Sequence, residues 1–478
     1  MRKRLAVWRR LKNIVKNPRI SLYISAVFVG AITIVRGSEL LIFIALVPLV
    51  AYVAGNKHYS TRTYMLDLYA FSWIESGFAN LFIMQLSPEN WNVQISAGMS
   101  IFARLVSWLI MCGLISLSFA LLGFVLSRIG SNKYRLVALV LLFPIAELLR
   151  SYLYAIVSYG PGASLSPNYN WGAVAVSVAG TPFVYVSRFV GFFGLSVVAL
   201  LVASLLYCAW KRRSVIFVGA LALLIASTYA AYRLDGSIKG ETITVSVLHL
   251  AEKEDAKALE LRHWPEPGSD LFVLPEYSAI SQNPQSAEVA KRMADNGVSI
   301  TTIVNGPSPR GTNQLQFFNG VNQVVEKQDK TFLIPNGEFL PYLLQFIFWT
   351  VGKQNLSVDF KYTQQITPGS RPEEVYDTGS FRVGALPCSG VSALNEYSRL
   401  SRGGADVLVN SASLSFFSNK SFYHTFAFNM ARYHAVSNRK PFVQASRSGE
   451  SYILDRQGKI LVYQDENRTT LLTTQLSL

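Results

Sequence analysis

The chain has 478 residues, of which 50% are hydrophobic and only 15% charged, with a formal net charge of +15 at pH 7. Residues 1–240 hold 22 Lys+Arg and 6 Asp+Glu (net +16), whereas residues 241–478 hold 22 and 23 (net −1), and together these give +15. A nucleic-acid-binding patch would lie on a folded polar domain, so this distribution argues against a nucleic-acid partner. Basic residues between apolar spans instead indicate membrane topology.

Seven apolar segments follow one another in residues 1–232, and a span needs about 20 apolar residues to cross a bilayer. Connections rich in Lys and Arg alternate with connections that are poor in them, beginning with eight basic residues in the first 19. By the positive-inside rule the N-terminus lies inside and residues 233–478 lie outside. The sequence therefore predicts a membrane domain over 1–232 with about seven transmembrane helices, near 20–35, 38–54, 64–86, 99–127, 134–157, 183–210 and 214–232.

Five charged residues fall within or at the edges of these spans: Asp67, Glu75, Arg104, Glu147 and Arg150. Charges there are costly, and they usually face a bundle interior or a polar cavity. Pairing and snorkelling near the interfaces would explain them equally well. The Gly-, Pro- and aromatic-rich loop at 158–172 is predicted at the outer membrane surface, and its composition alone does not make it a site.

Residues 233–478 have a different sequence pattern, in which short β-rich runs alternate with helical segments. Helices are expected near 252–264, 283–296, 390–402 and 421–438. The mixture predicts a layered α/β domain of roughly 235 residues. Strands are expected at 242–250, 270–276, 299–306, 315–326, 330–335, 381–388, 405–412, 440–446 and 451–455.

Three reactive side chains stand at predicted strand ends: Glu276 in LFVLPEYS, Lys330 in KTFLIPNGE and Cys388 in FRVGALPCSG. A thiol between a strand and a helix would lie near the helix N-terminus, which would lower its pKa and favour the thiolate. A carboxylate base and a lysine close by would complete a nucleophilic site. Taken singly, each has a simpler interpretation, namely a small buried cysteine, a surface glutamate and a solvated lysine.

The order Glu–Lys–Cys on an α/β domain resembles the carbon–nitrogen hydrolase (nitrilase) superfamily. DLFVLPEYS resembles the family's general-base segment, and QDKTFLIPNGEFLP its lysine followed by Pro-x-Gly-Glu. A multi-span membrane domain ahead of such a domain resembles the bacterial apolipoprotein N-acyltransferases, a membrane-bound branch of that superfamily. The resemblance implies a polytopic α-helical membrane domain, 1–232, joined to an extracytoplasmic nitrilase-like αββα sandwich, 233–478, in the bacterial inner membrane.

The resemblance also implies a reaction. Glu276 takes the proton of Cys388 as its sulfur attacks a phospholipid ester, while Lys330 and the Ser389 backbone N–H stabilise the oxyanion. The acyl chain then passes from the thioester to the N-terminal amine of a diacylglyceryl-cysteine lipoprotein, and Glu338 holds Lys330 or orients the amine. The implied partners are a phospholipid donor, a diacylated lipoprotein acceptor and the membrane. No cofactor and no metal is expected, because the histidines are scattered.

Both implied substrates are lipids, so an apolar entrance to the site is expected. The segment 339–352, with Trp349, is predicted to dip into the membrane interface. The segment 413–423, with Phe416 and Phe417, is predicted to form a second aromatic flap. A buried core helix and an ordinary loop with core phenylalanines are the alternatives for the two segments.

The sequence also departs from the family. The family follows its cysteine with an aromatic residue and a glutamate, where this chain has Ser389 and Gly390. These changes keep two alternative functions open. One is a membrane-tethered amidase or an N-acyltransferase for a different amine, and the other is a non-catalytic binding protein, although retention of Glu276, Lys330 and Cys388 argues against the latter.

Overall fold

Contacts between Cα atoms divide the computed structural model into two units. One unit comprises Met1–Met84, Ala103–Ile156 and Tyr169–Leu234, and the other comprises Gln85–Phe102, Val157–Asn168 and Asp235–Leu478. The second unit thus includes a short stretch, Val157–Asn168, that in the sequence is preceded and followed by residues of the first unit. The structure describes residues 17–55, 59–85, 96–235, 240–251, 264–265, 268–278, 301–307, 311–318, 324–415, 417, 422–465 and 468–478.

The first unit is helical. Its N-terminal helix begins where the Asn17 side chain accepts a hydrogen bond from Arg19 N and Pro18 occupies the first turn, both of which favour helix initiation. Its elements are α2 (Pro18–Ile34), η1 (Glu39–Leu41), α3 (Ile42–Ala45), α4 (Val47–Val53), α5 (Thr61–Ala79), η2 (Leu81–Gln85), α6 (Ala97–Ile115, shared with the second unit), α7 (Leu117–Ser127), α8 (Asn132–Val157), α9 (Val174–Ala179), η4 (Pro182–Val186), α10 (Ser187–Arg212) and α11 (Val215–Asp235).

Four helical stretches in the described residues are long and apolar enough to cross a membrane: Gly98–Ser127, Asn132–Val157, Pro182–Arg212 and Val215–Arg233. At most half of each apolar window is buried within the chain, and only 11% of the last one. The remaining apolar surface therefore faces outward, as in helices surrounded by lipid. Pro18–Ile34 and Glu39–Val53 are apolar but shorter. The chain is a membrane protein, and the number of seven spans stays a prediction.

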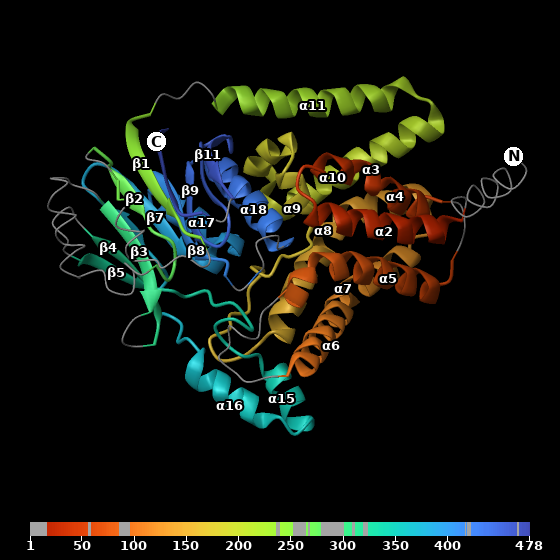
Figure 1. Ribbon diagram of the computed structural model, residues 1–478. Helices are drawn as coiled ribbons and strands as arrows, with labels where there is room; N and C mark the ends of the chain where they lie inside the picture. Colours follow the sequence, from red (N-terminus) through yellow and green to blue (C-terminus); the bar gives the residue numbers. More distant parts are fainter. Residues whose placement is uncertain are drawn as a thin grey trace, which may run out of the picture. The chain divides into compact units, whose positions relative to one another are not determined.

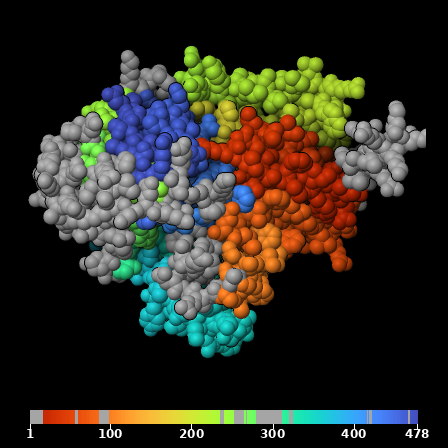
Figure 2. Space-filling view, viewed as in Figure 1, coloured from red at the N-terminus to blue at the C-terminus, as the bar shows by residue number. Residues whose placement is uncertain are grey.

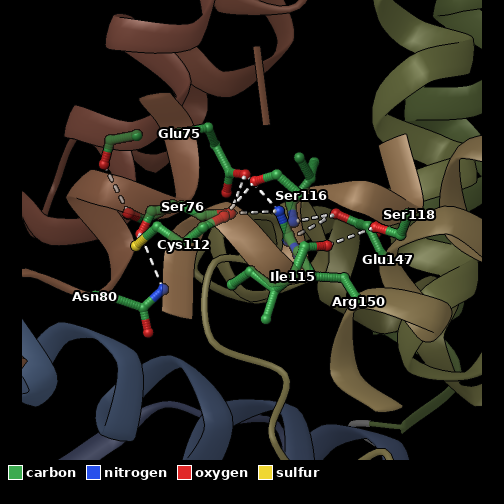
Figure 3. A network of polar contacts seen from close by, with 12 residues as sticks. Glu75, Ser76, Asn80, Cys112, Ile115, Ser116, Ser118, Glu147 and Arg150 are labelled. Carbon is green, nitrogen blue, oxygen red and sulfur yellow. Dashed lines mark hydrogen bonds and ion pairs between the residues drawn. The ribbon is translucent and has the colours of Figure 1, made fainter. Parts of the chain in front are cut away.

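The charged residues within the helical unit have polar partners. Asp67, fully buried, accepts hydrogen bonds from Arg19 and two tyrosines. Arg150 lies between Glu75 and Glu147, bonded to Glu75 and 3.9 Å from Glu147 Oε1 (Figure 3). Arg104 donates to the Met84 carbonyl oxygen at 2.7 Å. Pairing rather than snorkelling therefore accounts for the buried carboxylates, since an isolated charge would be costly there.

The second unit is built on two six-stranded sheets (Figure 1). In each sheet, three neighbouring strands run parallel: β1, β2 and β3 in the first, and β7, β8 and β9 in the second. The first sheet has the order β12 (Thr470–Ser477), β1 (Thr242–His249), β2 (Leu271–Val273), β3 (Thr301–Pro307), β4 (Asn313–Phe318) and β5 (Val324–Asp329). The second has the order β11 (Ile460–Gln464), β10 (Ser451–Leu454), β9 (Phe442–Arg447), β8 (Val407–Ser413), β7 (Arg382–Pro387) and β6 (Val375–Asp377).

The two sheets pack face to face. Alternate apolar residues of both form one buried cluster, with Val245 and Val247 from β1 and Val383 from β7 among its members. Side chains alternate between the faces of a strand, so one face of each sheet supplies the shared core. Helices α17 (Glu396–Arg402) and α18 (Phe422–Asn438) belong to the second sheet's side of the unit, where Tyr397 donates to the Val409 carbonyl oxygen in β8. The sandwich fold expected from the sequence is confirmed.

Four sequence predictions need correction or lie wholly or mostly outside the described residues. The single strand expected at 315–326 is a hairpin of β4 and β5, because the chain reverses after Phe318. Residues 330–335 form a loop rather than a strand. The helix expected at 283–296, and most of that at 252–264, lie outside the described residues.

A helical hairpin, α15 (Tyr342–Thr350) and α16 (Gln354–Thr363), follows the loop that contains Glu338. Leu344, Phe348 and Phe360 are buried within it, whereas Phe346 and Trp349 are 59% and 64% exposed. The hairpin lies at the surface in Figure 2, where it is cyan. It is therefore not the buried core helix that the sequence left open as an alternative.

Candidate active site

The three strand-end residues come from different parts of the sandwich. Glu276 follows β2 by three residues, Lys330 follows β5 directly, and Cys388 follows β7 directly. The carboxyl ends of β2 and β7 lie where loops of parallel sheets commonly build sites. Lys330 reaches the same place because β5 runs antiparallel to β4, and Lys330 N donates to the Asn313 carbonyl oxygen at 2.7 Å.

These side chains meet in a buried polar cluster. Lys330 Nζ lies 2.7 Å from Glu338 Oε1 and 3.9 Å from Glu276 Oε1. The Cys388 thiol donates to the Ser413 carbonyl oxygen at 3.5 Å, and the Glu276 carboxylate lies near enough to act on the pKa of that thiol. Lys330 is 1% exposed and Glu276 2%. A lysine is seldom so buried unless it is paired, and here two carboxylates pair with it.

Three further residues that sequence reasoning missed hold this cluster in place. Asn313 donates to Glu276 Oε1, and Ser413 N donates to Glu276 Oε2 at 3.0 Å. Glu373, also buried, accepts hydrogen bonds from Thr331 N at 3.0 Å and Thr331 Oγ1 at 2.8 Å, directly after the lysine. The only local signal for Asn313 and Ser413 was a polar residue at the end of a strand, a common occurrence that does not identify a partner, and Glu373 lies in a loop two residues before β6.

Burial dominates the electrostatics of the cluster. Burial raises the pKa of Glu276, although the Lys330 charge opposes this rise. Burial also raises the pKa of the Cys388 thiol well above its usual value, and the negative charge of Glu276 raises it further. Burial lowers the pKa of Lys330, but the Glu338 and Glu276 carboxylates outweigh this and leave that pKa raised. Lys330 is therefore charged and the thiol is neutral before reaction.

The expected lowering of the thiol pKa by a helix N-terminus is therefore wrong. Cys388 begins η5 (Cys388–Ser392), a single 3-10 turn, and α17 starts only at Glu396. A short turn has little dipole to offset desolvation. The thiol therefore needs a base to remove its proton, and the Glu276 carboxylate beside it can accept that proton.

The turn at Cys388 has an unusual backbone. Cys388 has φ +36°, in the left-handed region, which is strained for a residue with a Cβ atom. Asn410 Nδ2 donates to the Cys388 carbonyl oxygen at 3.1 Å and to the Leu386 carbonyl oxygen at 3.0 Å, which stabilises this conformation. Ser389 Oγ donates to the Phe332 carbonyl oxygen at 2.8 Å, so the hydroxyl binds the turn to the lysine loop.

Gly390 stands where the family resemblance places a glutamate, and this corner has no room for a side chain. A Cβ atom there would lie 2.5 Å from Leu386 Cβ, closer than real Cβ contacts. A carboxylate at this position would need the turn or Leu386 to shift. The packing of the corner, and not only its sequence, therefore differs from what the resemblance implies.

The residues expected to guide lipids lie in different environments. Trp349 projects from α15 and is 64% exposed. Phe417 is 5% exposed and stacks on Tyr423, with ring centroids 4.9 Å apart, so in this conformation it does not form an exposed flap. Phe416 lies outside the described residues. Among the described residues, no group of three or more His, Cys, Asp and Glu is arranged to hold a metal ion.

The fold and this cluster define the class of protein. Residues 247–478 match the model of the family described as Carbon-nitrogen hydrolase. This part of the chain is therefore similar to the carbon–nitrogen hydrolase family, the resemblance that the order of Glu276, Lys330 and Cys388 led us to expect.

Three curated relatives, each named apolipoprotein N-acyltransferase, are similar over a larger part of the chain. The protein of Allorhizobium ampelinum is 25% identical over 359 residues, which is 68% of this chain and 64% of that protein. That of Geobacter metallireducens is 29% identical over 283 residues, covering 55% and 50%. That of Agrobacterium fabrum is 24% identical over 383 residues, covering 72% and 67%. The chain thus spans between half and two thirds of their length, and the resemblance stated from the sequence is confirmed.

Among solved structures, a carbon-nitrogen hydrolase from Helicobacter pylori G27 is 17% identical and covers 49% of this chain and 89% of its own, with a TM-score of 0.37.

Proposed function

We propose that the protein is a membrane-bound N-acyltransferase in which Cys388 is the nucleophile, Glu276 the general base and Lys330 the cation that stabilises the oxyanion. The acyl donor is a phospholipid, and the acceptor is the N-terminal amine of a diacylglyceryl-cysteine lipoprotein. The observation that carries the proposal is that the partly buried Cys388 thiol lies with the buried Glu276 carboxylate and Lys330 ammonium. The name shared by the three relatives supports the choice of reaction.

The first half-reaction forms a thioester. The Cys388 sulfur attacks the ester carbonyl carbon as its proton moves to Glu276, whose burial-raised pKa makes the carboxylate a stronger base. Lys330 is charged and lies 3.9 Å from that carboxylate. Together with the Ser389 backbone N–H, it would stabilise the negative charge that develops on the carbonyl oxygen. Collapse of the intermediate expels the lysophospholipid alkoxide, which takes the proton from Glu276.

The second half-reaction consumes the thioester. The lipoprotein amine attacks the thioester carbonyl carbon, and Glu276 removes a proton from the nitrogen. The carbon–sulfur bond breaks, an amide is released, and the Cys388 thiolate regains its proton. Glu338, 2.7 Å from Lys330, keeps the ammonium oriented in both half-reactions.

Lipid substrates require access from the bilayer, and two features support this. The part of the chain that the structure describes has four helical stretches long and apolar enough to span a membrane. The exposed aromatic side chains of α15, Trp349 and Phe346, follow Glu338 closely in sequence, and such side chains favour the membrane interface. We place the protein in the bacterial inner membrane with the second unit on the extracytoplasmic side, on the basis of the alternating basic connections.

An experiment in cells tests the proposal. The chain is expressed in bacteria depleted of their own N-acyltransferase, and lipoprotein N-termini are analysed by mass spectrometry. N-acylated termini are expected with the wild type and should be absent with Cys388→Ala at equal protein levels. Unmodified termini with a well-expressed wild type would refute lipoprotein acylation.

A second candidate is a membrane-tethered amidase or an N-acyltransferase for a different amine. The closed corner at Gly390, where Leu386 fills the place of a side chain, favours keeping this candidate because the residues next to Cys388 differ from the family pattern. The two functions separate at the second half-reaction. A purified acyl-enzyme that transfers its chain to water or to small amines, but not to a diacylglyceryl-cysteine peptide, would identify the second candidate.

A further inference from the structure

The loop at 157–168, rich in Gly, Pro and aromatic residues, has no part in the reaction described so far. It connects α8 to Tyr169, both in the helical unit, yet its own contacts place it in the catalytic unit. We call Val157–Asn168 the strap. Its contacts lie on the two catalytic loops, one containing Glu338 and the other Cys388.

The first half of the strap packs on the loop of Glu338. The Tyr159 carbonyl oxygen accepts a hydrogen bond from Tyr342 N at 2.8 Å. A Cβ atom on Gly160 would lie 2.8 Å from the Leu340 carbonyl oxygen, so only glycine allows this approach of two backbones. Gly162, with φ +87°, lies against the Leu333 side chain in the same loop. The strap therefore contacts this loop both before and after Glu338.

The last residue of the strap holds the turn of the nucleophile. Asn168 Oδ1 accepts a hydrogen bond from Leu394 N at 3.1 Å, and both residues are buried. Leu394 lies two residues beyond η5, the turn that begins with the strained Cys388. A strained residue persists only where its surroundings fix it, and Asn168 supplies one fixed point from 226 residues earlier in the chain.

Both ends of the strap are fixed within the helical unit. Before it, α8 carries Glu147 and Arg150, and after it Val174 N donates to Glu147 Oε1 at 2.6 Å. Arg150 bonds to Glu75, and a Cβ atom on Gly172 would lie 3.0 Å from Glu75 Oε1. Figure 3 shows Arg150 reaching toward both carboxylates. Because these groups are buried and charged, separating them is costly, so the two segments that flank the strap in the sequence are firmly held to each other within the helical unit.

We propose that the strap is a positioning element of the active site, with Asn168 as its positioning residue for the Cys388 turn and Gly160 for the Glu338 loop. No strap residue acts on the substrate. The strap fixes the distance and orientation between the nucleophile and the Lys330–Glu338 pair. The inference rests on the proposed role of Cys388 as nucleophile.

The test uses the full-length protein in detergent and p-nitrophenyl butyrate, a soluble ester that bypasses lipid binding. The release of p-nitrophenol during the first turnover measures acylation of Cys388. Asn168→Ala removes the acceptor of the Leu394 hydrogen bond and should slow acylation ten- to a hundredfold with the half-saturating ester concentration unchanged, as expected for misplacement of a reacting group. Asn168→Asp keeps an acceptor oxygen and should recover most of the rate.

Gly160→Ala tests the other loop, because the added methyl group meets the Leu340 backbone, and it should also slow acylation. Ser166→Ala is the matched control within the strap, since it loses only a hydrogen bond to Ser164, and it should acylate like the wild type. These two variants decide the question should Asn168→Ala not fold.

Wild-type acylation rates in Asn168→Ala or Gly160→Ala would overturn the proposal. So would a loss in Asn168→Ala that Asn168→Asp does not restore. If the wild type itself shows no more acylation than Cys388→Ala, the nucleophile assignment fails, and the role of the strap fails with it.

Discussion

His434 provides a prediction whose size follows from its surroundings. The residue lies on α18 with no exposed surface, and its Nε2–H donates to the Val391 carbonyl oxygen in the nucleophile turn at 2.9 Å. The ring lies among the aromatic rings of Tyr397 and Phe442, with centroids 4.7 Å and 6.2 Å away. Burial lowers the pKa of His434 from 6.5 to about 4. The imidazole is therefore neutral in the folded protein at pH 7.

Lowering the pH from 7 to 5 should destabilise the fold through this residue. In the unfolded chain the imidazole titrates near pH 6.5 and is largely protonated at pH 5, whereas in the folded protein it stays neutral until about pH 4. Stability present above pH 6.5 is thus lost as the pH falls toward 4. At pH 5 the difference is about 1.5 pH units, or roughly 2 kcal/mol at about 1.4 kcal/mol per unit.

The measurement compares thermal unfolding of the wild type and His434→Gln in detergent at pH 7 and pH 5. Glutamine can donate to the same carbonyl and does not titrate in this range. About 2 kcal/mol corresponds to roughly 4–8 °C in melting temperature for a unit of this size. Between pH 7 and pH 5, the melting temperature of the wild type should therefore fall by that amount more than the melting temperature of the variant. Equal falls in the two proteins would show that His434 is not a buried neutral histidine, and the reasoning from burial would be refuted.

Four other substitutions, in three experiments, test the catalytic cluster and its surroundings. Lys330→Met leaves the Glu276 and Glu338 carboxylates buried without a cation, so it should abolish acylation and destabilise the protein by about 3–5 kcal/mol. Adding Glu338→Gln to this variant should restore part of the melting temperature, and no restoration would contradict the pairing. Trp349→Ala should weaken binding to phospholipid vesicles while leaving acylation by p-nitrophenyl butyrate unchanged, and unaltered vesicle binding would argue against interfacial contact. Gly390→Ala should cost about 1–3 kcal/mol in thermal unfolding because its methyl group meets a packed side chain, and a neutral effect would show that the corner is not closed.

The protein's division into an apolar basic half and a polar half follows from composition alone. Hydropathy and charge are properties of contiguous segments, so they identify membrane helices without tertiary information. The alternation of short β-rich runs and helical segments likewise predicted the layered α/β fold. Two predicted strands were wrong. At 315–326 the local pattern was right for extended chain but could not show where the chain reverses, and at 330–335 a β-rich run forms a loop.

The order of Glu276, Lys330 and Cys388 could also be predicted from the sequence, because each stands at the end of a β-rich run. The residues that contact them could not be predicted. Ser413 N contacts Glu276 across 137 residues and Asn168 contacts Leu394 across 226, and no local pattern records such distances. Long-range contacts depend on strand order, which is decided only when the sheets assemble.

The chemical state of the site was decided entirely by tertiary structure. The sequence placed Cys388 before a helix and predicted a thiolate, but the folded chain partly buries Cys388 near a carboxylate, and desolvation raises the pKa of its thiol. Desolvation sums the effect of every group packed around a site, so it cannot be derived from neighbours in the chain. Sequence alone thus determined which residues could react and on which side of a membrane to expect them, whereas packing decided their protonation, their spacing and the closed corner at Gly390.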